Sequence, residues 1–199
     1  MVADPAAPSG PWLVVGLGNP GSRYADTPHN IGYLVLDELA ERMGGSLRLH
    51  KSRRADVLEG RLELGGPRVV LGRARCYMNE SGGPVKELLG FYTLGPERLV
   101  VIHDEIDLPF DALRVKYGGG DNGHNGLRSL RGSLGTGDFY RVRVGVDRPQ
   151  GGRSAADHVL TPVSPVNRKE IPFLVSRSAD AGVSLIVQGL DKTQSAYNT

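Results

Sequence analysis

The sequence has very little cysteine and no long apolar run. Cys76 is the single cysteine among 199 residues, so no disulfide can form within the chain. One lone thiol is typical of proteins kept in the reducing cytoplasm, where we expect this chain to act. No apolar stretch approaches the ~20 residues that a membrane-spanning helix requires. The sequence therefore predicts a cytoplasmic protein without a membrane partner.

A strong charge of one sign is also lacking. There are 24 Lys and Arg residues against 22 Asp and Glu residues, a formal net charge of +2, which does not by itself indicate a nucleic-acid-binding protein. Basic residues do recur through one stretch, with acids interspersed. On charge alone this pattern is typical of a solvated surface, and the alternative is a contact surface for an anionic partner. The residues are Arg114, Lys116, Arg128, Arg131, Arg141, Arg143, Arg148 and Arg153.

What the sequence does contain is an alternation of strand and helix patterns. The short apolar run WLVVGLG is typical of a buried strand, and NIGYLVLDELAERMGG has apolar residues at helical spacing. Two strand-like segments separated by Gly65-Gly66 predict a hairpin. Three further strands are predicted in RLVVIHDEIDLP, ALRVKYGGG and FYRVRVGVD, followed by a helical region from Ser164 to about Gly189 in which Pro172 is an irregularity.

This alternation predicts an α/β fold, namely a single-domain three-layer sandwich. Helices would cover both faces of a twisted, mixed and mainly parallel sheet, with an antiparallel edge from the hairpin. We expect residues 1–11 to form a disordered leader, 12–190 the domain and 191–199 a C-terminal tail. Binding sites gather at the carboxyl ends of such strands. Four polar clusters fall at or beside these ends: Gly18-Asn19, Met78-Asn79, His103-Asp104 and His124-Asn125.

The turn GLGNPG after the first strand matches the G-x-G-x-x-G dinucleotide-binding pattern. Three features argue against a nucleotide. The segment SRYADTP separates the third glycine from the helix, Pro20 removes a backbone N–H that would face phosphate, and Asp37 lies inside the helical run. We expect the turn to place Asn19 against a different ligand.

His29 follows Thr27-Pro28, a plausible N-cap and first helical residue, and so is expected in the first helical turn. The positive end of the helix dipole disfavours a protonated ring there, and a neutral imidazole is what a general base needs. The alternative is an ordinary surface histidine. Asp104 closes an apolar strand, where it would either orient His29 by accepting a ring N–H or cap a turn.

Other site chemistries have less support. His29, His103, His124 and Asp104 lack the close spacing of a metal motif, and no G-x-S-x-G segment indicates a nucleophilic serine. We expect no metal and no cofactor. The segment GGGDNGHNGL is either a plain connector or a flexible loop whose following helix start and Asn125 amide face a substrate.

Four segments, in order, resemble the signature segments of bacterial peptidyl-tRNA hydrolases: VVGLGNPGSRYADTPHNIGY, MNESGGPV, IHDEIDLP and GGGDNGHNGLRSL. The resemblance extends from about Trp12 to about Leu190. Members of that family cleave the ester between a peptide and the 3′ ribose of tRNA without a metal or cofactor, and most are monomeric α/β proteins. The resemblance thus implies that this chain acts on peptidyl-tRNA as a monomer.

By motif, the resemblance implies that His29 is the catalytic base and Asp104 its partner. Other residues would bind the substrate. Asn19, Asn79 and Asn125 would line the cleft, Tyr24 and Met78 would lie beside the peptide or its ester linkage, and Lys116 and Arg143 would hold the tRNA 5′-phosphate. Arg114 falls where the family often has lysine, and Asp121-Asn122 where relatives often have other residues. The alternatives are a non-catalytic tRNA- or RNA-binding protein on the same scaffold and a nucleotide-dependent enzyme.

Overall fold

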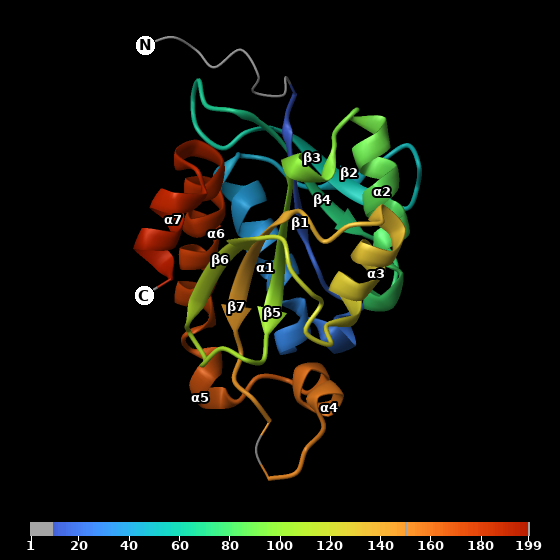
Figure 1. The fold of residues 1–199 in the computed structure, drawn as a ribbon. Coiled ribbons are helices and arrows are strands. Elements are labelled where there is room, and N and C mark those ends of the chain that lie inside the picture. The colour runs from blue at the N-terminus through green and yellow to red at the C-terminus, as the bar shows by residue number, and fades with distance from the viewer. Residues whose placement is uncertain (1–9, 150, 199) are drawn as a thin grey trace.

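In the computed structural model, which describes residues 10–149 and 151–198, seven strands form one sheet in the order β2-β3-β4-β1-β5-β7-β6 (Figure 1). The predicted leader at residues 1–9 lies outside the described residues. The strands are β1 (Trp12–Gly16), β2 (Arg48–Leu49), β3 (Ala55–Arg61), β4 (Arg68–Ala74), β5 (Leu99–Glu105), β6 (Leu113–Tyr117) and β7 (Tyr140–Gly145).

The four central strands β4, β1, β5 and β7 are parallel, and antiparallel strands lie at both edges. The predicted hairpin is confirmed as the β3–β4 pair. The sequence did not predict that β6 is antiparallel to β7 at the other edge. A parallel crossover needs roughly a dozen residues, and the segment between β5 and β6 is shorter, so β6 returns in the opposite direction.

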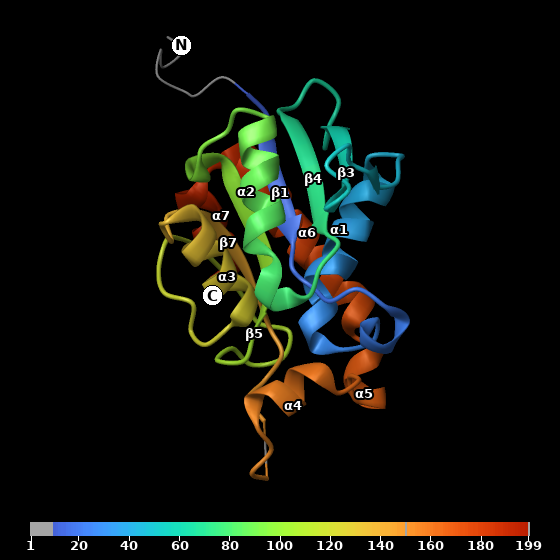
Figure 2. The ribbon, with the colours of Figure 1, turned by 90° about the vertical axis from the view of Figure 1, so that its right-hand side faces the viewer.

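Helices cover both faces of the sheet, which confirms the three-layer sandwich (Figures 1 and 2). Strand residues alternate between two cores, so that Val14 and Ile102 pack towards α1 (Ile31–Arg42) and α6 (Ile171–Gln188). Leu13 and Val101 pack towards α2 (Gly82–Phe91) and α3 (Asn125–Leu134). Pro172 lies in the first turn of α6, where proline is tolerated. None of the helices in the described part of the chain has the length and apolarity that crossing a membrane demands.

The predicted tail from residue 191 is instead a helix, α7 (Leu190–Tyr197), which packs against α6 and β6. Side chains near the C-terminal end of α7 form hydrogen bonds with backbone groups of edge strand β6 that face away from the sheet. The side chains of Gln194 and Asn198 each donate to the Val115 carbonyl at 2.9 Å, and the Val115 N–H donates to Asn198 Oδ1 at 2.6 Å. Without α7, these backbone groups of the edge strand would have no protein partner, so the hydrogen bonds to them stabilise the folded helix.

The carboxyl ends of β5 and β7 point to the same edge of the sheet, and α4 (Ala155–Leu160) and α5 (Pro165–Arg168) lie just beyond it (Figure 1). Four 3₁₀ turns complete the described chain: η1 (Ser22–Tyr24), η2 (Pro28–Asn30), η3 (Met78–Glu80) and η4 (Pro96–Arg98). Two of them, η2 and η3, carry predicted site residues to this edge.

Candidate active site

His29 is the middle residue of the 3₁₀ turn η2, which precedes α1. The sequence predicted that the α-helix starts near Thr27, but α1 starts at Ile31. Thr27 does not cap the turn with its side chain, because its hydroxyl donates to the Tyr24 carbonyl at 2.8 Å. The tighter turn leaves His29 buried at the end of the sheet, with 7% of its surface exposed, so the surface-histidine alternative is wrong.

Two glycines let this turn come close to the sheet. A Cβ on Gly16 would collide with the Gly32 carbonyl, and a Cβ on Gly32 would lie 2.5 Å from the backbone nitrogen and oxygen of Leu17 and from the Ile102 carbonyl oxygen. Side chains at these positions would push α1 away from β1 and β5. The close packing therefore sets the distance between His29 and the end of β5.

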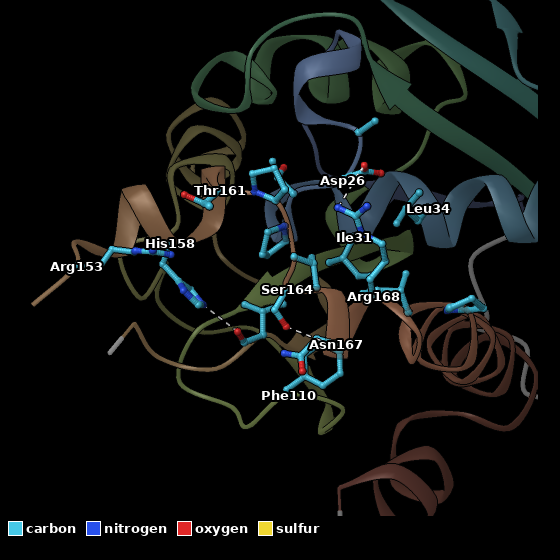
Figure 3. Close-up of a pocket in the computed structure, with 18 residues that line it drawn as sticks. Asp26, Ile31, Leu34, Phe110, Arg153, His158, Thr161, Ser164, Asn167 and Arg168 are labelled. Atoms are coloured by element: carbon cyan, nitrogen blue, oxygen red, sulfur yellow. Dashed lines mark hydrogen bonds and ion pairs between the residues drawn. The ribbon is translucent and has the colours of Figure 1, made fainter. Parts of the chain in front are cut away.

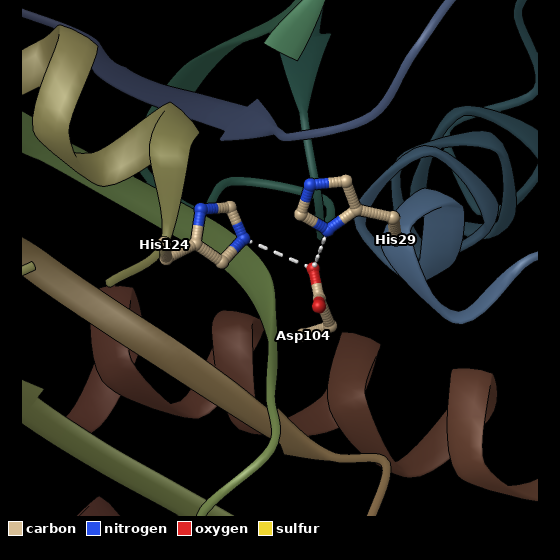
Figure 4. A group of neighbouring side chains, drawn as sticks. All are labelled: His29, Asp104 and His124. Atoms are coloured by element: carbon tan, nitrogen blue, oxygen red, sulfur yellow. Dashed lines mark hydrogen bonds and ion pairs between the residues drawn. The ribbon is translucent and has the colours of Figure 1, made fainter. Parts of the chain in front are cut away.

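Asp104 lies near the end of β5 and joins two histidines through one oxygen (Figure 4). His29 Nδ1 is 2.9 Å from Asp104 Oδ1, and His124 Nε2 is 3.0 Å from the same atom. Burial alone would raise the pKa of this carboxyl, but the charge and hydrogen bonds that His29 and His124 offer hold it well below its usual range. Asp104 is therefore a carboxylate at neutral pH.

The hydrogen bonds of His124 determine which ring nitrogen carries its proton. His124 is the N-cap residue of α3, and its Nδ1 accepts from the backbone N–H of Gly126 at 3.1 Å and of Leu127 at 3.4 Å. Nδ1 must then be unprotonated, so Nε2–H donates to Asp104. Because an ionised carboxylate can only accept a hydrogen bond, His29 donates Nδ1–H to Asp104, and its Nε2 is left as the basic atom.

The same tautomer bears on metal binding. The three ligand atoms of His29, Asp104 and His124 lie within 4.8 Å of one another, and two imidazoles with a carboxylate are a suitable donor set for a transition metal. A metal on His124 Nε2 would require an unprotonated Nε2 and would move the ring proton to Nδ1, where two backbone N–H groups already donate. The geometry thus favours a hydrogen-bonded triad over a metal site.

Asn19 is fixed by a neighbour that sequence analysis missed. Asn30 Oδ1 accepts from the Asn19 N–H at 2.8 Å, and Asn30 Nδ2 donates to the Asn19 carbonyl at 3.0 Å. The Asn19 side chain in turn accepts from the Met78 N–H at 2.8 Å through Oδ1, which leaves its NH₂ group as the donor for a ligand. The position of Asn30 directly after His29, in the same turn, was the available signal.

A cavity of about 160 Å³ contains the triad. Asn125 lines it at the start of α3, Asn122 and Gly123 of the glycine-rich loop form one side, and Val159 of α4 contributes to its wall. Asn19, Tyr24 and Asn79 do not line it. Asn19 lines a separate cavity with Tyr33 and Arg73, Tyr24 packs edge-on against the exposed ring of Tyr77, and Asn79 is exposed on η3. Met78 is buried, and its Sδ lies 2.5 Å from where a Cβ on Gly126 would be.

A larger cavity of about 540 Å³ is lined by Thr27 and Pro28, the two residues before His29, but by no residue of the triad (Figure 3). Its walls include Ile31, Leu34 and Phe110, with the Asp26–Arg168 ion pair at 3.6 Å on its lining. It has the volume for a small ligand, but His158 on its lining contacts the Val146 carbonyl through Nε2 at 3.0 Å and is not paired with a carboxylate of the described chain. The smaller cavity, which contains the histidine–carboxylate triad, is therefore the candidate active site.

The predicted phosphate-binding residues share one face of the sheet. Arg114 and Lys116 on β6 pair in register with Arg143 and Arg141 on β7, so all four side chains project to the side that α3 covers. Arg143 Nε is 3.0 Å from Oε2 of buried Glu105. Burial, then the nearby Arg143 and Arg141, lowers the pKa of Lys116.

Arg141 was not predicted as a site residue. It is 1% exposed, and its guanidinium donates to the carbonyls of Gly119, Gly120 and Gly137. It thereby anchors the start of the glycine-rich loop that leads to His124. Its alternation with Arg143 along β7 was the signal that could have found it.

A model of the peptidyl-tRNA hydrolase family matches residues 13–199. The chain belongs to this family. It is 53% identical to a peptidyl-tRNA hydrolase from Arthrobacter sp. (strain FB24), over 94% of this chain and 96% of that protein. It is 55% identical to one from Leifsonia xyli subsp. xyli (strain CTCB07), over 94% and 97% of the two chains. A crystal structure of peptidyl-tRNA hydrolase from Acinetobacter baumannii superposes with a TM-score of 0.86 at 33% identity, covering 95% of both chains.

In this member of the peptidyl-tRNA hydrolase family, the first two glycines of GLGNPG allow close packing, and Gly21 adopts a positive φ of 103°. A Cβ on Gly18 would lie 2.7 Å from the Tyr33 ring. Asp37, which a dinucleotide site would use to bind ribose, is paired with Arg73 at 3.1 Å. The turn holds Asn19 beside Met78 instead.

Proposed function

We propose that this chain hydrolyses the ester between the peptide and the 3′ ribose of peptidyl-tRNA, with His29 as the general base. The observation that carries the proposal is the 2.9 Å contact between His29 Nδ1 and Asp104 Oδ1 beside a cavity, in a chain of this family. Asp104 holds the ring so that Nε2 takes a proton from a water molecule, and the water oxygen attacks the ester carbonyl. The proton then passes to the departing ribose 3′ oxygen. General-base catalysis of this kind contributes roughly 10² to 10⁴ in rate.

His124 supports this arrangement as a second donor to Asp104. Because it fixes Oδ1 from the other side at 3.0 Å, the carboxylate cannot rotate away from His29 without losing a hydrogen bond. When His29 becomes protonated during the reaction, the ionised carboxylate stabilises its charge. We assign His124 the role of a positioning residue in this mechanism.

Amide groups would bind what every substrate shares, the peptide backbone and the developing oxyanion. Asn19 offers its NH₂ group, Asn125 lines the cavity, and Asn79 lies on the neighbouring turn. Loss of one donor to an oxyanion typically costs ~10² to 10³ in rate. Tyr24 and Met78 would lie beside the peptide or its ester linkage.

The tRNA would bind across the basic face. Lys116 and Arg143, with Arg114 beside them, would hold the 5′-phosphate, and the basic stretch that includes Arg128 and Arg131 would contact the acceptor stem through phosphates and helix shape. The proposal includes action as a monomer and without a cofactor, as the resemblance to the family implies. The single cysteine supports action in the cytoplasm.

The test is cleavage of N-acyl-aminoacyl-tRNA compared with unblocked aminoacyl-tRNA. We expect the wild-type protein to cleave only the first, and His29→Ala to lose at least about 10² in kcat while its affinity for tRNA in a filter-binding assay stays within about twofold. His50→Gln, a histidine change beside β2, is the matched control and should retain the wild-type rate. Wild-type turnover by His29→Ala would contradict the base assignment, and RNA binding without cleavage by the wild-type protein would support a non-catalytic role.

A further inference from the structure

The glycine-rich loop carries one carboxylate, Asp121, and this group faces two arginines of α3. Asp121 Oδ2 is 2.9 Å from Arg131 Nη1, and Arg128 Nη2 is 3.7 Å from Asp121 Oδ1. Asp121 Oδ1 also accepts from the Gly123 N–H at 3.0 Å. This backbone hydrogen bond, with the arginines, lowers the pKa of Asp121 and keeps it charged at neutral pH.

The two arginines lie on the outward side of α3. Leu127 and Leu130 bury the inner side of this helix against the sheet, whereas the side chains of Arg128 and Arg131 are 62% and 42% exposed. Asp121 is itself only partly exposed, at 21%. The loop carboxylate thus contacts cations that a solvent-borne anion can also reach.

These arginines are continuous with the proposed 5′-phosphate site. Arg131 and Arg143 are both close enough to Arg141 to lower its pKa, after the larger effect of burial, and Arg143 and Arg141 act on Lys116 in the same way. Two carboxylates act in the opposite direction and raise the pKa of Arg141: Glu105, which is buried against Arg143, and Asp121, which lies at the rim of the face. The face from α3 to β6 is therefore mainly cationic, and Asp121 is the carboxylate on it that contacts the exposed arginines of α3.

We propose that Asp121 limits how tightly this face binds the tRNA acceptor stem, because it competes with RNA phosphates for Arg128 and Arg131 and repels phosphates that approach them. The inference rests on the proposed function, since it requires that RNA occupies this face. A charge at the rim of a binding surface acts mainly on association and its salt dependence. Asp121 thus lowers the affinity of this face for the acceptor stem.

Asp121→Asn removes the charge and little else. An asparagine has the same shape and retains the Oδ1 acceptor for the Gly123 N–H, so the loop conformation is preserved. Glu41→Gln is the matched control: it changes the net charge by the same amount from an exposed site on α1, which covers the opposite face of the sheet. A difference between the two variants isolates the local effect from the overall charge.

The experiment measures kcat and KM on peptidyl-tRNA from about 50 to 200 mM salt. We expect Asp121→Asn to lower KM about two- to fivefold at low salt, the effect of a partly exposed charge, and to steepen the slope of log(kcat/KM) against log[salt] by about one phosphate contact. Glu41→Gln should change neither quantity. Both variants should cleave a short peptidyl-nucleoside ester, which has no acceptor stem, at the wild-type rate.

A double-mutant cycle with Arg131→Gln tests whether Asp121 acts on RNA binding through Arg131. Arg131→Gln alone should raise KM, and the gain from Asp121→Asn should shrink in its presence, because the freed arginine is then missing. If Asp121→Asn leaves KM and the salt slope unchanged while Lys116→Ala and Arg143→Ala raise KM, the inference about Asp121 is overturned and the proposed function stands. If none of the basic-residue variants changes KM, RNA does not occupy this face. The inference then falls together with the proposed tRNA-binding role of Lys116 and Arg143, whereas hydrolysis by His29 is tested separately by His29→Ala.

Discussion

Asp104 receives two N–H groups on a single oxygen atom, and each donor comes from a different part of the chain. His29 reaches it from the turn before α1, and His124 from the start of α3. Neighbouring Glu105 points to the other face of the sheet, where it pairs with Arg143. Two consecutive residues at one strand end therefore belong to different clusters, Asp104 to the histidine triad and Glu105 to the basic face.

Asp104→Asn should reduce kcat by roughly 10² to 10⁴ with little change in KM for tRNA. The amide Oδ1 of an asparagine can still accept both ring N–H groups, but the amide has no charge, so the protonated form of His29 loses its stabilisation. Steady-state kinetics on N-acyl-aminoacyl-tRNA measure both constants. A rise in KM at unchanged kcat would place Asp104 in binding and contradict its role as partner of the base.

The same substitution should alter how stability depends on pH. The pKa of Asp104 is lower in the native state than in the unfolded chain, where it is about 3.9. Its stabilising contribution is therefore complete above about pH 4 and is lost as the pH falls towards the native pKa. Urea unfolding between about pH 3 and pH 7 should show less acid destabilisation in Asp104→Asn than in the wild type. Parallel pH profiles would contradict the lowered pKa.

At the scale of elements, the approach of α1 to β1 and β5 decides where His29 lies. Gly32 is in the first turn of α1, and its Cα is against the backbones of Leu17 and Ile102. Sequence periodicity predicted this helix, but the 3₁₀ turn before it was not predictable, because Thr27-Pro28 is an equally good start for an α-helix.

Gly32→Ala should destabilise the protein by about 1 to 3 kcal/mol, because the new methyl group would force α1 off the strands. Gly90→Ala in α2 is the matched control, since nothing lies within 4 Å of its Cβ position, and it should stabilise by about 0.5 to 1 kcal/mol through helix propensity. Urea denaturation gives both values. Equal changes in the two variants would contradict a packing role for Gly32.

At the scale of the whole molecule, the sheet is protected at the β6 edge by α7. Gln194 and Asn198 occupy the outward N–H and C=O of Val115, positions that a strand from another molecule would otherwise take. This protection depends on two amide side chains near the C-terminal end of the described chain.

Deletion of residues 190–199 should therefore lower the unfolding temperature and cause concentration-dependent association, which size-exclusion chromatography with light scattering measures. The double variant Gln194→Ala, Asn198→Ala keeps the helix and removes only the edge contacts, so it should associate more than the wild type but unfold less readily than the deletion. A monomeric, stable deletion variant would contradict the role of α7.

The sequence sufficed for the α/β class and the β3–β4 hairpin, because both depend on local periodicity. Strand ends left open whether Asp104 orients His29 or caps a turn, and the family resemblance favoured the pairing with His29 that the structure shows. It did not predict α7, whose few apolar residues, Leu190 and Tyr197, are only partly buried and give a weak helical pattern. The roles of His124 and Arg141 were also not predicted, because both depend on how the glycine-rich loop folds over the end of the sheet.

Because the tautomer of His124 is fixed, nuclear magnetic resonance can detect the ring protons of the site individually. Two ring N–H protons, one on His124 Nε2 and one on His29 Nδ1, point at the same buried carboxylate oxygen, and both are shielded from solvent exchange. Each should give a separate downfield proton resonance, with nitrogen-15 shifts that distinguish the two ring positions. Because both protons report on one oxygen, arrival of a substrate at His29 will be visible at His124 as well.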